Sequence, residues 1–433
     1  MRISGSAAAG IAARLFKAAS RAAGEVGVAR FGRFLDREGR PMDHGYLVEF
    51  PAGRSFTGEA TAELWPHGSP AVLAELVGAA VAAGAEHAGP GEFTYRALRN
   101  GRLDLARAEA VRDLVDARTR YQARVAFSQA EGSVSRRLAP LRDALEEWIA
   151  RGEAAVEFVD EAETHLPRGD LLGPIERLRD DCRTLLKGYE SGRVVRDGAT
   201  MAMVGLPNVG KSSLFNRLLE KERAIVTEMP GTTRDTLEEL ISVGGIPLRL
   251  IDTAGLREVT DPIESEGVRR AELAREEADL VLMILDGSRP LEPLEQAALE
   301  REFKETARGR TVVALNKCDL PRVAGSSPEG LPVLEISART GAGIGALRKE
   351  LRRRLKGGGI LEDPIITDGR HAKALEDAVA ALERALRVAG DGMTEEVLLE
   401  EMREARRHLG SITGEFGTEE LYDRIFSTFC IGK

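Results

Sequence analysis

The chain has 433 residues, of which 43% are hydrophobic and 30% are charged, and its formal net charge is −9. These values are typical of a soluble protein of about three domains and exclude a generally basic nucleic-acid-binding surface, although they permit a local basic patch. No uncharged apolar run is long enough to cross a membrane, and Arg14 and Lys17 interrupt the alanine-rich start. We therefore expect a cytoplasmic protein with no membrane partner.

Cysteine usage agrees with that location. Cys182, Cys318 and Cys430 are too few and too scattered for a disulfide framework or a metal cluster. Each is expected to be a reduced thiol.

Residues 1–98 combine short apolar runs, such as 46–50, with turn signals, and they predict a small α+β domain. The region from about 102 to 195 has few strand signals and predicts helices. Its apolar residues recur on one helical face: Leu138, Leu141, Leu145, Trp148 and Ile149.

Residues 205–212, Gly-Leu-Pro-Asn-Val-Gly-Lys-Ser, fit the phosphate-binding pattern G-x-x-x-x-G-K-S. They follow the apolar run 201–204, which predicts a buried strand, and they precede helical spacing at 213–219. In this order the loop closes its backbone N–H groups on phosphate oxygens at a helix N-terminus. Lys211 is predicted to reach the outer phosphates, and the Ser212 hydroxyl to ligate Mg²⁺.

Three later segments favour GTP over ATP, and each follows an apolar run that predicts a strand. Residues 252–255, Asp-Thr-Ala-Gly, bring a carboxylate near the metal and a glycine amide near the last phosphate. Residues 316–319, Asn-Lys-Cys-Asp, end in a carboxylate that accepts two hydrogen bonds from guanine, a pattern that adenine cannot supply. Residues 337–339, Ser-Ala-Arg, place a backbone amide on the guanine oxygen.

The residue after the 252–255 segment is Leu256, where small signalling GTPases have the glutamine that orients the attacking water. An alkyl side chain cannot do this, so another group must hold the water, and a charge beyond Mg²⁺ and Lys211 must stabilise the phosphates in the transition state. The nearby candidates for the water are Glu258, Asp261, Glu264 and Glu266, and those for the charge are Arg234 and Arg257.

The first switch is expected at residues 224–235, where Thr233 is the better placed threonine to close on Mg²⁺. Asn208, inside the phosphate loop, has a side-chain oxygen that can face a cation lying along the phosphates. Together with backbone carbonyls of residues 227–232, it suggests an oxygen cage for a weakly hydrated monovalent ion.

The segment after the glycine linker at 356–359 is helical again. Its apolar stripe consists of Leu375, Val379, Leu382 and Leu386. Two helical parts on either side of the nucleotide motifs predict a nucleotide domain inserted into a helical domain whose two parts pack together. The expected domains are 1–98, 99–197, 198–356 and 357–433.

Five further motifs occur in order: Arg-Ile-Ser-Gly at 2–5, Ser-Phe-Thr-Gly-Glu at 55–59, Pro-Gly-Glu-Phe-Thr at 90–94, Arg-Leu-Asp-Leu-Ala at 102–106 and Phe-Cys-Ile-Gly-Lys at 429–433. With the nucleotide motifs they cover almost the whole chain. This set resembles the tRNA-modification GTPase family MnmE, also called TrmE.

The resemblance implies a P-loop GTPase domain with a mostly parallel sheet, inserted into a helical domain and preceded by an α+β domain that binds 5,10-methylene- or 5-formyl-tetrahydrofolate and forms a homodimer. It implies work with the FAD protein MnmG (GidA) to add an aminomethyl or carboxymethylaminomethyl group to C5 of the wobble uridine of tRNA. It also implies that the G domains pair when K⁺ is bound, with K⁺ in the role of an arginine finger.

The resemblance also implies roles for individual residues. Glu264 matches the water-positioning glutamate of the family, and with Lys211 and Arg257 it makes up the expected catalytic set. The expected Mg²⁺ ligands are Ser212 and Thr233, the expected K⁺ ligands are Asn208, Thr227, Met229 and Thr232, and the expected folate contacts are Arg2, Glu63, Arg102 and Lys433. The residues expected around GTP are Asn208, Val209, Gly210, Lys211, Ser212, Ser213, Thr227, Glu228, Met229, Pro230, Gly231, Thr232, Thr233, Asp252, Thr253, Ala254, Gly255, Asn316, Lys317, Asp319, Ser337, Ala338 and Arg339.

The chain departs from the family pattern in two places. Family members usually begin further upstream with a strand and a glycine-rich segment, so we expect the N-terminal sheet to lack its first strand. Residues 65–69 replace a usual Gln-Gly-His-Gly-Gly pattern. For Cys430 two interpretations stay open: a functional thiol near the folate, or a small buried side chain, which is favoured.

An alternative function is a ribosome-assembly or other RNA-associated GTPase switch, which would share all four nucleotide motifs. Such a protein is expected to carry a basic RNA-binding module, such as a KH domain, after the nucleotide domain. Residues 360–433 are instead acidic and helical in pattern.

Overall fold

The computed structural model describes residues 1–19, 27–157, 168–219, 238–252, 275–305, 310–323, 332–355, 364–391 and 394–432. The chain divides into two compact units. The first unit contains residues 1–112, 129–139 and 409–433, and the second contains residues 113–128 and 140–408. Within the described residues, no helix has both the length and the apolar character that a membrane span requires.

The first unit contains an antiparallel sheet covered on one face by α1 (Ala8–Leu15) and α2 (Pro70–Ala82). In its described part the strand order is β1-β5-β4-β3-β2. The strands are β1 Arg2–Ser4, β2 Phe16–Ala18, β3 Arg30–Leu35, β4 Pro41–Phe50 and β5 Thr61–Trp65. Side chains alternate between the two faces, so Phe34, Leu47 and Leu64 are buried against the helices. The predicted α+β domain is therefore present.

The C-terminal tail belongs to this first unit. An aromatic cluster joins α3 (Glu92–Arg99) to α15 (Glu419–Phe426), because the Tyr95 ring lies 5.3 Å from Phe426 and the Phe426 ring lies 5.0 Å from Phe429. The Tyr95 hydroxyl also donates to Glu419 at 2.8 Å. Ile431 then forms a backbone bridge with Pro90.

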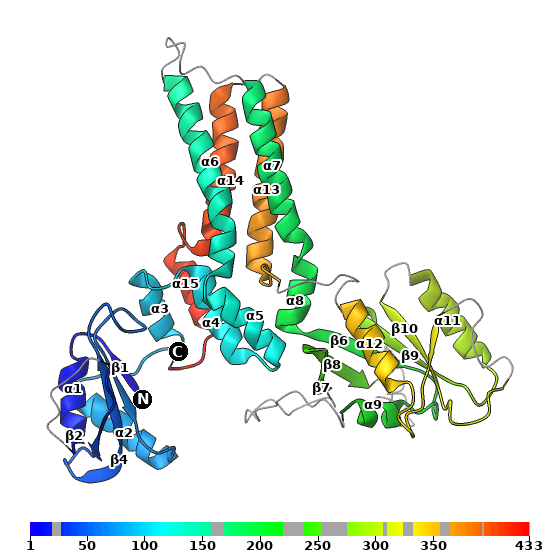
Figure 1. The fold of residues 1–433 in the computed structure, drawn as a ribbon, viewed down its shortest axis with the longest axis horizontal. Helices are drawn as coiled ribbons and strands as arrows, with labels where there is room; N and C mark the ends of the chain where they lie inside the picture. The colour runs from blue at the N-terminus through cyan, green and yellow to red at the C-terminus, as the bar shows by residue number, and fades with distance from the viewer. Residues whose placement is uncertain are drawn as a thin grey trace, which may run out of the picture. The chain divides into compact units, whose positions relative to one another are not determined.

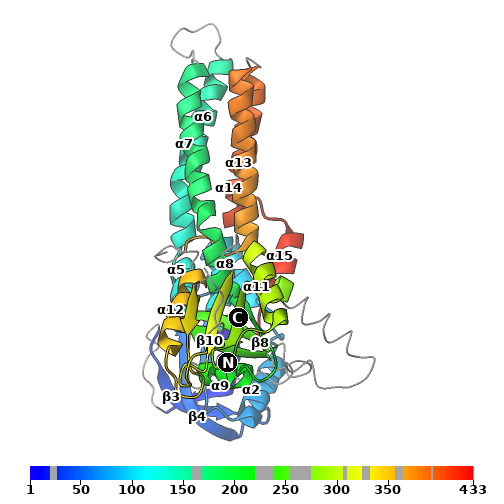
Figure 2. The same ribbon diagram turned by 90° about the vertical axis from the view of Figure 1, so that its right-hand side faces the viewer.

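The second unit contains long helices that lie side by side in both ribbon views (Figures 1 and 2). Arg183 of α7 pairs with Glu383 of α13, and Leu399 of α14 packs against Gly152 of α6. The helices that lie wholly or partly in this unit are α4 Leu105–Asp116, α5 Arg120–Ala130, α6 Ser133–Glu157, α7 Arg168–Lys187, α8 Tyr189–Asp197, α13 Gly369–Gly390 and α14 Glu395–Thr413. Helices from before and after the nucleotide motifs pack together, which confirms the predicted insertion.

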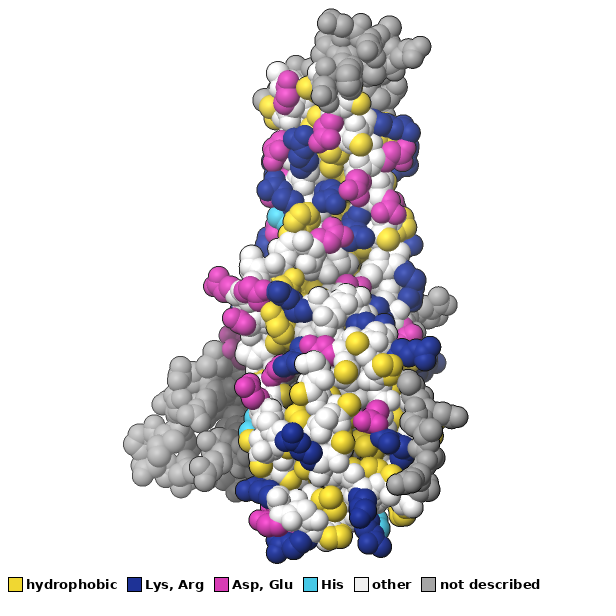
Figure 3. Space-filling model, turned by 90° about the vertical axis from the view of Figure 1, so that its left-hand side faces the viewer, with side chains coloured by type: hydrophobic (Ala, Val, Ile, Leu, Met, Phe, Trp, Pro, Cys, Tyr) yellow, Lys and Arg dark blue, Asp and Glu magenta, His cyan; other side chains and the backbone are white. Residues whose placement is uncertain are grey.

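The predicted apolar stripes form the core of these helices. Leu138, Leu145, Leu375 and Leu382 are fully buried, and Leu141, Ile149 and Val379 nearly so. Trp148 and Leu386 are only half-buried. The face seen in Figure 3 shows Lys and Arg side chains interspersed with Asp and Glu along the long helices. The ion pairs between these helices include Arg403–Glu153 and Arg406–Glu146.

The nucleotide motifs lie on a second sheet, whose described strands have the order β11-β10-β9-β6-β8-β7. Among these strands only β7 and β8 pair antiparallel. The strands are β6 Ala199–Val204, β7 Glu238–Val243, β8 Ile246–Asp252, β9 Leu280–Asp286, β10 Thr311–Asn316 and β11 Val333–Glu335. The helices of this part are α9 Lys211–Leu219, α11 Pro293–Glu305 and α12 Ile344–Leu355. Parallel strands are buried on both faces, which explains their continuous apolar runs.

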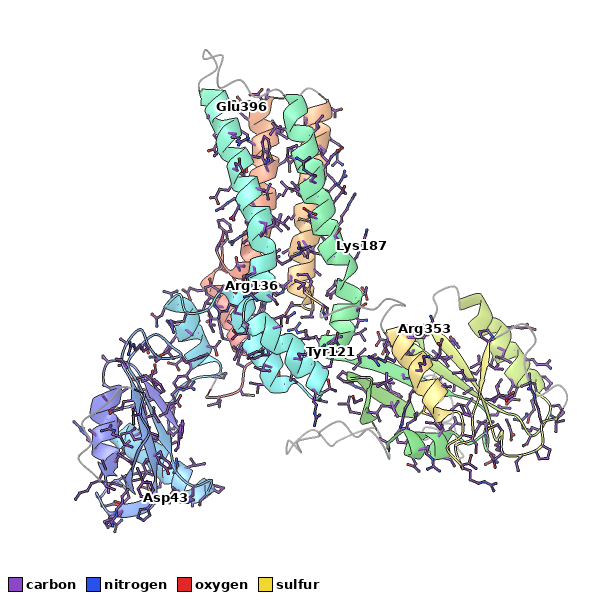
Figure 4. All side chains as sticks on the ribbon, viewed as in Figure 1. Asp43, Tyr121, Arg136, Lys187, Arg353 and Glu396 are labelled. Carbon is purple, nitrogen blue, oxygen red and sulfur yellow. The ribbon has the colours of Figure 1, made fainter. Side chains whose placement is uncertain are left out.

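Polar contacts tie the helical segments to this sheet. Arg196, at the end of α8, donates to both carboxylate oxygens of Asp113 at 2.7 and 3.1 Å and lies 2.9 Å from Asp368, which caps α13. Thr119 donates to the backbone oxygen of Gly245 in the turn between β7 and β8. Tyr121 of α5, labelled in Figure 4, packs against the same glycine.

Gly192 of α8 is a close-packing position, because a Cβ there would lie 2.0 Å from the backbone oxygen of Ile366. Backbone cannot move aside as a flexible side chain can, so we expect Gly192→Ala to lower the free energy of unfolding by about 1–3 kcal/mol. The matched control is Gly345→Ala in α12, where a Cβ would meet nothing within 4 Å. Thermal unfolding of the two variants checks this, and equal melting temperatures would contradict it.

Candidate nucleotide-binding site

The phosphate loop connects β6 to α9, in the strand, loop and helix order that the motif requires. Asn208 has φ 64° and Gly210 has φ 97°, so the loop turns through two residues in the left-handed region. Lys211 opens α9 and is only 8% exposed. Its ammonium donates to the backbone oxygens of Gly205 at 2.8 Å and Leu206 at 2.9 Å. The loop therefore holds a buried cation beside a helix N-terminus, which suits phosphate oxygens.

Two glycines of the loop allow close approach to neighbouring strands. A Cβ on Gly205 would lie 2.5 Å from the backbone oxygen of Ile284 in β9. A Cβ on Gly210 would lie 2.3 Å from the Nδ2 atom of Asn316, which ends β10. Close packing thus requires glycine at both positions, and the left-handed backbone requires it at Gly210 as well.

Asn316 links the phosphate loop to the last predicted segment. Its Nδ2 donates to the backbone oxygen of Val209 at 2.7 Å, and its Oδ1 accepts from the backbone N–H of Ala338 at 2.9 Å. The side chain is 2% exposed. The structure therefore brings together three sequence motifs through one buried amide.

Asp319 lies at the exposed edge of this arrangement. The Ser337 hydroxyl donates to one of its carboxylate oxygens at 2.6 Å, and Arg339 lies 2.8 Å from the other. The hydrogen bond from Ser337 holds the pKa of Asp319 below its ordinary value. An ionised carboxylate that accepts hydrogen bonds matches the N1–H and 2-amino donors of guanine.

Comparisons with known proteins show to which proteins the chain is similar. Residues 1–102 match the N-terminus of the GTP-binding protein TrmE, and residues 105–430 match the MnmE helical domain. A protein of Koribacter versatilis named tRNA modification GTPase MnmE is 42% identical over 408 residues, which are 94% of this chain and 89% of that protein. The protein of the same name from Chloroflexus aurantiacus is 40% identical over 440 residues, covering 100% of this chain and 96% of that protein.

The chain belongs to the MnmE family of tRNA modification GTPases.

Membership of the MnmE family confirms the predicted fold class and enzyme class: the protein is a GTP hydrolase. It disfavours the ribosome-assembly alternative. In the described residues after α12, the chain forms the helices α13, α14 and α15 and no strand of a KH-like module.

The other predicted nucleotide residues divide into two groups. Ser212 and Ser213 lie exposed on the first turn of α9, and Asp252 ends β8, paired in register with Met203 of β6. The predicted residues that lie outside the described residues are Thr227, Glu228, Met229, Pro230, Gly231, Thr232, Thr233, Thr253, Ala254, Gly255, Arg257, Glu264 and Lys433.

Two residues of this candidate site were not predicted from the sequence. Arg217 of α9 donates to the backbone oxygens of Ala338 and Arg339 and so supports the last motif. Asp286 accepts from Lys317 at 2.6 Å. The one available signal was the position of Asp286, because it ends an apolar strand on the edge where the motifs gather.

The residues that the sequence predicts as folate contacts belong to the first unit. Arg2 donates to Glu63 at 2.9 Å, and its guanidinium lies 5.4 Å from the Phe56 ring and 5.5 Å from the Phe93 ring. Arg102 packs beside Gly58. Next to them, Ser4 donates to Glu59, which also pairs with Arg96. The favoured interpretation of Cys430 as a small buried side chain is wrong, because the residue is exposed.

Proposed function

We propose that the protein hydrolyses GTP with the phosphates in the loop at 205–212 and the guanine on Asp319, in support of C5 modification of the wobble uridine in tRNA. The observation that supports this most directly is the buried Asn316 amide, which joins the phosphate loop to the segment beside Asp319. This contact couples the position of the phosphates to that of the base. The site therefore favours GTP over a nucleotide that fits only the phosphate loop or only the base-binding segment.

The proposed catalytic set is Lys211, Glu264 and Arg257. Lys211 supplies a fixed positive charge at the outer phosphates, and Glu264 orients the attacking water in place of the missing glutamine. Ser212 and Thr233 are the proposed Mg²⁺ ligands, and the exposed Ser212 hydroxyl beside Lys211 fits that assignment. Bound Mg²⁺ would neutralise charge on the phosphates.

We also propose that K⁺ binds to the Asn208 side chain and to Thr227, Met229 and Thr232. The support lies in the loop conformation, because a left-handed backbone at a residue other than glycine is uncommon and concentrates at functional sites. Asparagine tolerates it and adds an oxygen ligand.

The experiment that tests this function is the rate of GTP hydrolysis in KCl and in NaCl at equal ionic strength. We expect hydrolysis to be about 10²-fold faster in KCl, because one charge at the phosphates in the transition state has effects of that order. Asn208→Ala should abolish the difference between the salts. Asn216→Ala, an exposed asparagine on α9, is the matched control and should retain it. Equal rates of the unmodified protein in both salts would refute the K⁺ site.

The proposed assembly is a homodimer formed by the N-terminal domain. On the outer face of its sheet, Phe31, Tyr46 and Trp65 lie directly opposite one another on β3, β4 and β5, and they are 45–51% exposed. This row supports the proposal, because contiguous exposed aromatic side chains are typical of interaction surfaces. Sedimentation velocity of Trp65→Glu tests this, and an unchanged dimer would exclude this face.

We propose that folate binds to Arg2, Glu63, Arg102 and Lys433, and that the exposed Cys430 lies near it. Calorimetric titration of 5-formyl-tetrahydrofolate checks this, since no heat of binding would refute the site.

The FAD protein MnmG is the proposed partner, and co-purification from the cytoplasm with tRNA present tests it. The domain boundaries at 98, 197 and 356 stay predictions that limited proteolysis can test.

A further inference from the structure

A buried carboxylate lies beside the proposed guanine site and is part of none of the nucleotide motifs. Asp286 is the last residue of β9 and is 6% exposed. Its Oδ2 accepts from the Lys317 ammonium at 2.6 Å. Its Oδ1 accepts from the backbone N–H of Ser288 at 2.9 Å and from the Ser288 hydroxyl at 2.6 Å. Both oxygens are therefore used inside the protein.

The segment that Asp286 contacts has an unusual backbone. Lys317 has φ 68°, a left-handed conformation that a residue with a long side chain rarely adopts. In the sheet, Asn316 lies in register with Asp286, and the backbone N–H of Gly287 donates to the backbone oxygen of Asn316 at 2.9 Å. The turn after β9 thus holds the backbone of the segment, and the Asp286 carboxylate holds the Lys317 side chain.

The charge state of Asp286 supports a strong contact. Burial opposes ionisation of this carboxyl, but the hydrogen bonds from Lys317 and Ser288 outweigh it and hold its pKa below the ordinary value. The carboxylate is therefore ionised at neutral pH. The Lys317 side chain is 31% exposed, so the ion pair lies at the border between the protein interior and the site.

We propose that Asp286 is a positioning residue of the guanine site, which holds the Lys317 side chain in place before the nucleotide binds. A lysine side chain has large rotamer freedom, and fixing it in advance avoids losing that freedom on binding. Asp286 therefore raises nucleotide affinity without touching the nucleotide. This inference rests on the proposed placement of guanine on Asp319.

The test is a double-mutant cycle in the full-length protein, with the affinity for a fluorescent GDP analogue as the readout. Asp286→Asn removes the charge and retains the shape. We expect about tenfold weaker binding in the unmodified background and less than about twofold in the Lys317→Met background, because the effect acts through the ammonium. Hydrolysis should show the loss in KM, while kcat at saturating GTP is retained.

A matched control comes from the same neighbourhood. Glu295 is also buried and ionic, and it accepts from Arg289 at 2.9 Å on each oxygen, but among the described residues it forms no hydrogen bond or ion pair with Lys317. Glu295→Gln should leave GDP affinity unchanged. Asp286→Glu, which retains the charge, should restore affinity to within about threefold of the unmodified protein, and it keeps the test informative where Asp286→Asn folds poorly.

The outcomes distinguish the positioning role of Asp286 from the placement of guanine on Asp319. Equal weakening by Asp286→Asn in both backgrounds would show support of the turn alone and overturn the positioning role. If Asp319→Asn weakens GDP binding but Asp286→Asn leaves the affinity unchanged, the positioning role of Asp286 is also overturned. Unchanged affinity of Asp319→Asn would instead overturn the proposed guanine site itself.

Discussion

Lys211→Ala is expected to lower the rate of GTP hydrolysis by about 10²–10³-fold, the usual effect of removing one preorganised charge from a reaction site. Lys211 is 8% exposed and is held by the backbone oxygens of Gly205 and Leu206, so its position is set before the substrate arrives. A mobile, solvent-exposed side chain could not replace the Lys211 ammonium, because its charge would not be held at the phosphates in advance. Lys211→Arg should not restore the rate, because a planar guanidinium does not fit between two carbonyls placed for a compact ammonium.

Single-turnover release of phosphate at saturating GTP measures this effect separately from binding. Lys349→Ala, on the exposed face of α12, changes the same charge elsewhere and should retain the full rate. A rate of Lys211→Ala within threefold of that control would remove Lys211 from the catalytic set.

Asp319→Asn is expected to weaken GTP binding by at least about 10²-fold and to create binding of xanthosine triphosphate. A site built to pair with specific hydrogen-bonding groups rejects a ligand that leaves those groups unpaired, by large factors. In the proposed site the carboxylate accepts from N1–H and the 2-amino group of guanine. An asparagine brings an N–H₂ group against that amino group, whereas the 2-oxo group of xanthine accepts from it.

The ion pair with Arg339 does not protect Asp319 from this change. Arg339 has a 77% exposed side chain, and exposed pairs contribute little. Competition of GTP and xanthosine triphosphate for a fluorescent nucleotide measures the switch. Asp180→Asn replaces an exposed acid of α7 and should keep the preference for GTP. If both variants prefer GTP equally, guanine is not held by Asp319.

Much of the nucleotide site was predictable because its motifs are local in the chain. A phosphate loop needs its glycines and its lysine within a few residues, since strand, turn and helix follow one another directly. The predicted strands and apolar stripes were confirmed for the same reason, because hydrophobic spacing reports which face of an element is buried. Two residues of the predicted stripes, Trp148 and Leu386, are only half-buried. Spacing along one helix does not show where a neighbouring helix ends.

Contacts between distant segments could not be predicted in this way. Cys430 was expected to be buried because cysteines usually are, but it lies in a tail whose position depends on the packing of Phe429 against α15. Asp286 and Lys317 are 31 residues apart in the chain, and only the pairing of β9 with β10 brings them together. Arg196 likewise meets Asp113 and Asp368 only after the helical segments have folded against each other.

The sequence by itself determined that this protein binds GTP, since four ordered motifs specify backbone conformations and donor groups over short distances. It also determined that helical parts flank the nucleotide domain, since helical spacing needs no knowledge of the partner. Only the tertiary structure decided how the motifs are joined, through the Asn316 amide, and how Lys317 is held, through Asp286. The physical reason is that hydrogen bonds between buried groups depend on strand register, which the whole sheet sets and no single segment encodes.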